Sequence, residues 1–133
     1  MAGEMTPTGI GYPPVAALAP PGGHYSHAVR ANGCVFVSGQ LPITPDGERL
    51  SGRPFEQQAR QALANVEAAL HAAGSDVDRL LQVRVYVSDM EYWPAFDGIY
   101  ATWAGAAQPA RAVVPTGPLH HGLLVEVEAV ALG

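Results

Sequence analysis

Residues 54–87 read PFEQQARQALANVEAALHAAGSDVDRLLQVRVYV, and two different periodicities meet in this one stretch. Apolar side chains first recur at spacings of three and four residues, which predicts a helix that begins at Pro54 and ends at Gly74. From Leu81 to Val87 they alternate with polar side chains, which is typical of a half-buried strand. A helix followed closely by a strand indicates a domain in which helices cover a sheet.

Two strands are expected on the N-terminal side of this stretch. Residues 26–31 and 34–39 flank Asn32-Gly33, a dipeptide that accepts the positive φ angles of a two-residue hairpin turn. The pattern therefore predicts an antiparallel hairpin that precedes the helix.

The segment before the hairpin is rich in proline. Five of the 12 prolines of the chain precede residue 22. Because proline fixes φ and cannot donate to a strand ladder, we expect residues 1–22 to form an extended or mobile arm, with residues 15–18 as a short edge strand at most. The remaining residues, 23–133, form the folded domain in this interpretation.

On the C-terminal side, the pattern predicts a second helix and two more strands. Asp89 is placed to cap a helix over residues 91–104, and strands are expected at 111–114 and 123–131. The order β-β-α-β-α-β-β favours an α+β two-layer sandwich in which both helices cover one face of the sheet. The other face would be left uncovered, so we expect it to mediate oligomerisation.

Composition narrows the class of protein. The 133 residues suffice for one domain, and 48% of them are apolar against 14% charged. Seven basic and 12 acidic residues give a net charge of −5, which disfavours a nucleic-acid partner. Because all seven basic residues are arginines, catalysis through a lysine Schiff base and lysine attachment of pyridoxal phosphate are excluded.

Localisation is expected to be cytoplasmic. Residues 1–11 carry Glu4 and lack the basic and apolar regions of a signal peptide, and no stretch has the apolar length of a membrane-spanning helix. The single cysteine, Cys34, excludes an internal disulfide and a cysteine-rich zinc site. The five histidines lack His-x-x-x-His spacing, so we expect no metal site.

The last strand and the segment before it hold the candidate site residues. Glu126 and Glu128 point away from the apolar face, which is ordinary if that face meets water and notable if it is covered. Arg111 enters an apolar strand and either pairs with Glu126 or Glu128 or offers its planar fork to a ligand anion. Ser38-Gly39 ends the second strand, where glycine allows close approach of a ligand or another chain segment.

Several of these motifs together resemble the Rid family, the YjgF-like reactive intermediate deaminases, and in particular imine deaminase A. The resemblance covers residues 22–132. Its carriers are Tyr25-Ser26-x-Ala28-Val29, residues 35–42, the helix with Asn65, the strand 83–90, Pro109-Ala110-Arg111 and residues 125–131.

The resemblance implies a chorismate-mutase-like fold and a homotrimer with clefts between adjacent subunits. It also implies hydrolysis of enamine/imine intermediates, such as 2-aminoacrylate and 2-imino acids, to 2-keto acids and ammonia. This is the C–N bond hydrolysis of a 2-iminobutanoate/2-iminopropanoate deaminase, and it needs no metal or organic cofactor.

The resemblance also assigns roles to residues of this chain. Arg111 would bind the substrate carboxylate, and Glu126 would act near the attacking water. The remaining substrate-binding positions fall on Tyr25, Ser38, Gly39 and the backbone of Val113. Asp97 departs from the family, which commonly has asparagine there, and so do His24 and the turn that carries His120 and His121.

Other functions remain open at this point. The same cleft would suit a non-catalytic trimer that binds small carboxylates, a regulatory trimer or a pathway-specific imine-processing step. Ribonuclease activity, known for some family members, is disfavoured by the charge of −5 and the absence of lysine. The deaminase interpretation requires the Arg111 guanidinium to be free to bind an anion in a groove shared by two protomers. If a protein acid engages it fully, or if it lies on the outer surface of a lone monomer, the interpretation fails and only the fold assignment stands.

Overall fold

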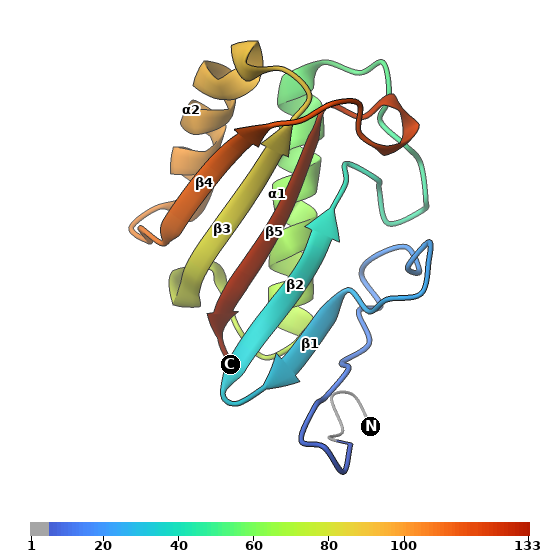
Figure 1. The fold of residues 1–133 in the computed structure, drawn as a ribbon, viewed down its shortest axis with the longest axis vertical. Helices are drawn as coiled ribbons and strands as arrows, with labels where there is room; N and C mark the ends of the chain where they lie inside the picture. The colour runs from blue at the N-terminus through green and yellow to red at the C-terminus, as the bar shows by residue number, and fades with distance from the viewer. Residues whose placement is uncertain (1–5) are drawn as a thin grey trace.

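The computed structural model describes residues 6–133 and shows two helices packed on a five-stranded sheet (Figure 1). Short 3-10 turns occur at Val77–Arg79, Met90–Tyr92 and His120–Gly122. In chain order the helices and strands are β1 (Ala28–Ala31), β2 (Cys34–Gln40), α1 (Phe55–Ala72), β3 (Leu80–Val87), α2 (Trp93–Ala104), β4 (Ala110–Pro115) and β5 (Val125–Leu132).

The sheet is mixed, with the strand order β1-β2-β5-β3-β4. Only β3 and β4 run parallel, and the other neighbours are antiparallel. The hairpin predicted at Asn32-Gly33 is confirmed, because both residues have positive φ angles, 53° and 73°, between β1 and β2. Strand β4 lies at the edge of the sheet beside β3.

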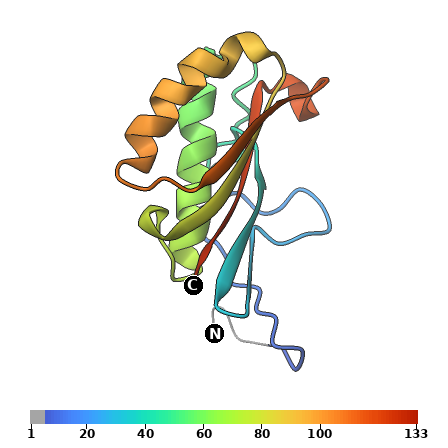
Figure 2. The same cartoon turned by 60° about the vertical axis from the view of Figure 1, so that its left-hand side comes forward.

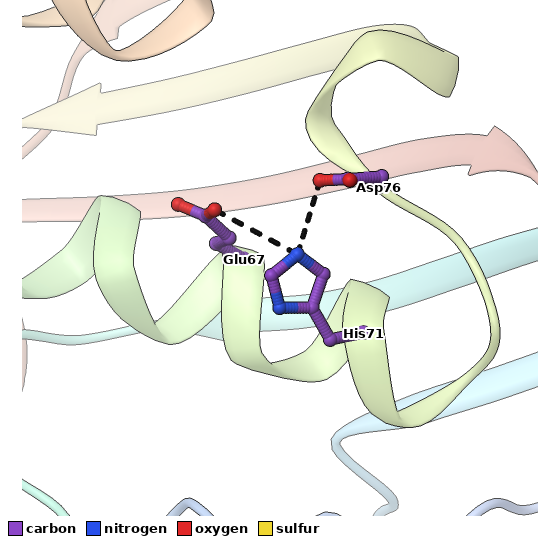
Figure 3. Close-up of side chains that lie close together, drawn as sticks. All are labelled: Glu67, His71 and Asp76. Carbon is purple, nitrogen blue, oxygen red and sulfur yellow. Dashed lines mark hydrogen bonds and ion pairs between the residues drawn. The ribbon is translucent and has the colours of Figure 1, made fainter.

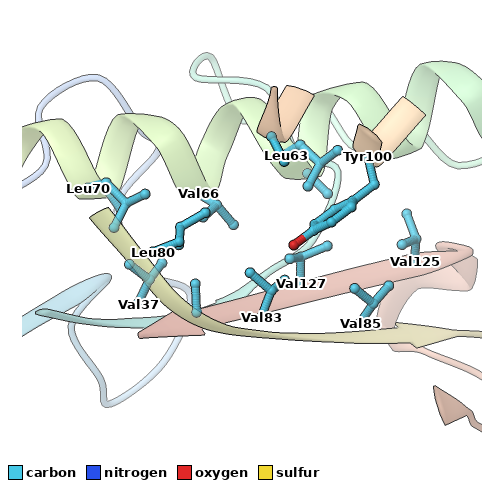
Figure 4. Packing of buried hydrophobic residues seen from close by; sticks show 14 of the residues in the cluster. Val37, Leu63, Val66, Leu70, Leu80, Val83, Val85, Tyr100, Val125 and Val127 are labelled. Atoms are coloured by element: carbon cyan, nitrogen blue, oxygen red, sulfur yellow. The ribbon is translucent and has the colours of Figure 1, made fainter. Parts of the chain in front are cut away.

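Both helices lie on the same side of the sheet, as predicted (Figure 2). Helix α1 begins after Pro54, and Gly74 with φ 82° follows its last turn. Leu63, Val66 and Leu70 lie on the apolar face of α1, and each of these side chains is at most 1% exposed. These side chains meet the valines of β3 and β5 in a continuous core (Figure 4). The predicted α+β two-layer architecture is therefore confirmed.

The second helix begins slightly later than expected. Residues 90–92 form a 3-10 turn. The Glu91 N–H in this turn donates to the Asp89 carboxylate at 2.9 Å. The α-helix proper starts at Trp93 and ends before Gly105, which has a φ of 61°. Asp89 thus caps this segment as its side chain predicted.

The described part of the proline-rich arm, residues 6–22, lies against the domain. Gly11 pairs with Arg30 through backbone hydrogen bonds of 2.8 and 2.9 Å. The short edge strand expected at residues 15–18 is wrong: the Leu18 N–H closes a turn onto the Val15 carbonyl at 3.1 Å. Prolines on both sides of these residues cannot donate to a ladder, which favours a turn here. Residues 1–5 lie outside the described part of the chain.

The second face of the sheet carries a mixture of apolar and acidic side chains and is not covered by either helix. Phe36 and Leu132 are 45% and 44% exposed on this open face. Glu126 and Glu128 project from β5 on the same side, opposite in register to Tyr86 and Arg84 of β3. Within residues 6–133, no helix is both long enough and apolar enough to span a lipid bilayer.

Candidate active site

Glu126 is a partly buried carboxylate on the open face of the sheet. Its neighbours Val125 and Val127 are fully buried under the helices, so the pleat turns Glu126 to the opposite side. Burial raises the pKa of its carboxyl, the nearby His120 lowers it, and Glu128 raises it. The net direction is upward, which favours a carboxyl that can exchange a proton closer to neutral pH than an exposed glutamate.

Gly39 provides the space that this carboxylate occupies. A methyl group placed on Gly39 would overlap the Glu126 carboxylate. Only glycine therefore fits at this position while Glu126 keeps its orientation. The structure brings together two of the residues that the sequence assigned to the site.

A cavity of about 430 Å³ lies beside these two residues. Tyr25 and Gly39 line it, and Tyr25 is 49% exposed. The Gly22 N–H donates to the Tyr25 hydroxyl at 3.4 Å. Residues 18–23 form one wall, so the end of the proline-rich arm contributes to the cavity, which was not anticipated from the sequence.

His27 and Gln40 join the arm to the sheet at the base of this cavity. The Ala19 carbonyl accepts a hydrogen bond from His27 Nε2 at 2.7 Å, so the ring proton resides on Nε2. Nδ1 lies 3.1 Å from the Gln40 amide nitrogen, so hydrogen bonds hold the ring on both sides. The hairpin register could have revealed this contact, since the Ser38 N–H pairs with the His27 carbonyl at 2.9 Å.

Ser38 is already engaged within the hairpin. Its hydroxyl donates to the Ser26 carbonyl at 2.5 Å. A ligand could therefore use the Ser38 oxygen only as an acceptor. The substrate-binding role of Ser38 remains a prediction.

Glu128, the second carboxylate on the open face, has a partner of its own. The Tyr86 hydroxyl donates to Glu128, and this hydrogen bond raises the pKa of the tyrosine. Glu128 is thereby tied to the sheet, whereas Glu126 faces Gly39. Within residues 6–133, the Glu126 carboxylate has no such hydrogen bond.

Arg111 lies on the helix-covered face at the sheet edge. It pairs in register with the buried Val83, so the two side chains share a face. Its Nη1 donates to the Asp97 carboxylate at 2.8 Å, and its guanidinium carbon lies 4.9 Å from the centre of the Tyr100 ring. Of the two alternatives left open for Arg111, the pairing with Glu126 or Glu128 does not occur, because β4 directs Arg111 toward Asp97 of α2. The ion pair with Asp97 also counts against the deaminase interpretation, which requires the Arg111 guanidinium to be available to a ligand anion.

Arg111 and Glu126 therefore lie on opposite faces of the sheet within one protomer. Arg111 lines a second hollow of about 450 Å³ together with Asp97 and Tyr100. Val113, two residues along β4, is partly buried against the core on this side. Within residues 6–133, no cavity brings the two expected catalytic side chains together.

A separate cluster of ionisable side chains lies at the end of α1. His71 Nε2 is 3.0 Å from the Asp76 carboxylate and 3.7 Å from that of Glu67 (Figure 3). In the part of the chain that the structure describes, this is the one group of three such residues close enough to share a metal ion. All three side chains are more than a third exposed, and the hydrogen bond between His71 and Asp76 helps to lower the pKa of the Asp76 carboxyl. Exposed polar contacts account for the cluster.

Comparison with known proteins identifies relatives over nearly the whole chain. A family model described as Endoribonuclease L-PSP matches residues 16–133, beginning within the arm. Protein HMF1 of Saccharomyces cerevisiae is 33% identical over 131 residues, which cover 98% of this chain and 97% of the relative. The 2-iminobutanoate/2-iminopropanoate deaminase of Mus musculus is 34% identical over 110 residues, or 83% of this chain and 82% of the relative.

A solved structure agrees with this assignment. The crystal structure of E. coli TdcF with bound serine has a TM-score of 0.82 and 29% identity, covering 89% of this chain and 94% of that one. The chain belongs to the endoribonuclease L-PSP family, which is the Rid or YjgF family that its sequence resembles.

Proposed function

We propose that this protein hydrolyses reactive enamine/imine intermediates of the 2-aminoacrylate/2-imino acid type to 2-keto acids and ammonia. The observation that carries the proposal is the partly buried Glu126 carboxylate, packed on Gly39 beside a cavity lined by Tyr25. The deaminase name of the mouse relative and the serine bound to TdcF support an amino-acid-derived substrate.

The chemistry makes modest demands on the protein. An imine carbon is already electrophilic, so water can add to it once the water is held in place and a proton is removed. Glu126 would accept that proton and return one to the nitrogen, which then leaves as ammonia. The balance is R–C(=NH)–COO⁻ plus water giving R–C(=O)–COO⁻ plus NH₃. A glutamate whose pKa is raised suits both transfers better than one of ordinary acidity.

The full site requires a second protomer, because Arg111 and Glu126 occupy opposite faces of the sheet. We infer a homotrimer in which Arg111 of one protomer meets the Glu126 cavity of the next. The half-exposed Phe36 and Leu132 on the open face favour its burial against another copy. Strand β4 lies at the sheet edge, where its neighbour can be a second chain.

The ion pair with Asp97 leaves Arg111 able to bind a substrate carboxylate. The pair uses Nη1 alone, and the side chains of Arg111 and Asp97 are 24% and 44% exposed. An exposed pair of this kind contributes about 0–1 kcal/mol, so it does not prevent a second anion from binding. The opposite edge of the guanidinium offers two parallel N–H groups for a bidentate contact.

An assay with a freshly generated imine tests this function. An amino-acid oxidase would supply 2-iminopropanoate from alanine, and its conversion to the keto acid would be followed with and without the protein. We expect Glu126→Gln to lower kcat/KM at least roughly a hundredfold. Glu128→Gln, which removes the neighbouring carboxylate on the same face, is the matched control. Light scattering on each variant would establish that assembly is retained.

Two results would overturn the proposal. One is a wild-type rate equal to that of buffer; if calorimetry then shows 2-keto acid binding, the protein is a non-catalytic carboxylate-binding trimer. The other is an Arg111→Ala variant as active as wild type. The ribonuclease named in the family description finds no support in the net charge of −5, so we do not propose it.

A further inference from the structure

The cavity beside Glu126 has an uneven distribution of charge. The basic side chains along its wall are Arg49, His27, His120 and His121, of which His27 is engaged by hydrogen bonds to the Ala19 carbonyl and the Gln40 amide. Among the described residues that line the cavity, none is an aspartate or a glutamate, and the one carboxylate that the proposed function uses, Glu126, lies against the lining residue Gly39. A positive wall in a protein of net charge −5 indicates a local preference for anions.

The other three basic residues come from two loops that are tied together. Arg49 follows the 43–49 turn, whose ends pair at Ile43 and Arg49. The Ser51 hydroxyl donates to the His121 carbonyl at 2.7 Å and so fixes the second loop against the first. The pKa of His121 is lowered by desolvation and by the nearby Arg49 and His120, which shows that the three groups lie close together and leaves Arg49 as the permanent charge of this wall.

Arg49 is not neutralised by its nearest acid in the sequence. Glu48 pairs instead with Arg53, at 3.0 Å. Among residues 6–133, no ion pair joins Arg49 to a carboxylate. Its guanidinium is therefore available to an anion from outside the chain.

The backbone at His121 also indicates a site rather than an incidental loop. His121 has φ 61° and ψ 19°, the left-handed region that costs a residue with a side chain about 1–2 kcal/mol. Gly122 follows with φ 68°, and the Ser51 hydroxyl holds the strained carbonyl. Strain of this kind persists where the surroundings fix a side chain in place, often at a binding site.

We propose that Arg49, His120 and His121 bind an anionic group on the substrate side chain, so that the preferred substrates are 2-imino acids with a second carboxylate. The inference rests on the proposed function, which places the reacting carbon at Glu126. His120 lies near enough to Glu126 to influence its carboxyl, so the basic wall begins next to the reacting centre. A substrate held there extends its side chain toward Arg49.

The experiment compares two imines on the assembled protein. An aspartate oxidase supplies 2-iminosuccinate, and an amino-acid oxidase supplies 2-iminopropanoate. We expect kcat/KM to favour the dicarboxylic imine at least roughly tenfold, and Arg49→Ala to lower that ratio by a similar factor, as for loss of a charge-assisted contact. Arg53→Ala is the matched control, because Arg53 pairs with Glu48 on the surface and does not line the cavity.

The two proposals fail in different ways. If both imines are hydrolysed but the neutral one is preferred, or if Arg49→Ala leaves the ratio unchanged, the anionic subsite is wrong and the deaminase function stands. If neither imine is hydrolysed faster than in buffer, the deaminase function is wrong. Calorimetric titration with oxaloacetate and with pyruvate then tests the anionic subsite by itself. Tighter binding of oxaloacetate that is lost in Arg49→Ala supports the subsite, and equal binding of the two keto acids overturns it.

Discussion

Replacing Asp97 with asparagine is expected to strengthen the binding of a small 2-keto acid by roughly three- to tenfold. Asparagine keeps an oxygen for the 2.8 Å hydrogen bond from Arg111 and removes the negative charge. A ligand carboxylate on the opposite edge of the guanidinium would lie about 6 Å from Asp97, where the repulsion is about 0.7 kcal/mol in water and about 2.8 kcal/mol at an effective dielectric constant of 20. Because both side chains are partly exposed, the lower half of that range applies.

Calorimetric titration with pyruvate measures this effect directly. The gain in affinity should shrink as salt is added, since screening weakens repulsion between partly exposed charges. Asp78→Asn is the matched control, because it removes one negative charge from an exposed position in the turn before β3. It should leave the dissociation constant within about twofold of wild type.

Equal or weaker binding by Asp97→Asn would refute the reasoning. It would mean that the ligand anion does not bind close to Asp97, and therefore that Arg111 is not its partner. The stability of this variant should fall by at most about 1 kcal/mol, as for the loss of an exposed ion pair. A larger loss would show that the pair serves the fold.

Three further predictions concern Glu126, Gly39 and Tyr100. The pKa of Glu126 in the folded state is raised from its ordinary value of 4.5, so the stability of the wild type should fall as the pH rises from that value through the raised pKa. Glu126→Gln should gain stability relative to the wild type over the same pH range. Urea unfolding at several pH values measures both effects, and the opposite slope would contradict the prediction. Gly39→Ala should displace the Glu126 carboxylate and reduce imine hydrolysis, while the free energy of unfolding changes by at most about 1 kcal/mol because the atoms that must move end a flexible side chain; unchanged activity would remove Gly39 from the site. Tyr100→Phe should raise the free energy of unfolding by about 1 kcal/mol, because the buried Tyr100 hydroxyl has no hydrogen-bond partner among residues 6–133. A loss of stability in a denaturant titration would indicate that the hydroxyl bonds to a group outside the protomer.

The fold was predictable because its main signals are local. The helical spacing after Pro54, the alternation up to Val87 and the turn at Asn32-Gly33 each act over a few residues, and tertiary packing agrees with all three. The arm at residues 15–18 was less predictable. Its apolar residues are too few to define a period, and their packing against the domain depends on contacts distant in sequence.

The candidate site was predictable only where the strand pleat or the resemblance specified it. Alternation along β5 placed Glu126 on the open face, and the resemblance placed Gly39 beside it. The face of the sheet on which Arg111 lies could not be predicted from the sequence. Apolar and polar residues do not alternate clearly along β4, and the register of β4 with β3 is set by the crossover through α2. Arg49 was not singled out from the sequence, and His121 was noted only as a departure from the family, because the two meet through irregular loops that no periodic pattern describes.

The pleat of the sheet explains why the proposed function needs residues from two chains. Successive residues of a strand point to opposite faces, so Glu126 cannot leave the open face without burying its charge under the helices. Arg111, held by Asp97 and Tyr100, is fixed at the edge on the other side. Within a protomer, no change of side-chain rotamer lets Arg111 and Glu126 contact the same small molecule. Association of protomers at the open face would therefore bury exposed apolar surface and complete the chemistry in the same step, which couples activity to assembly.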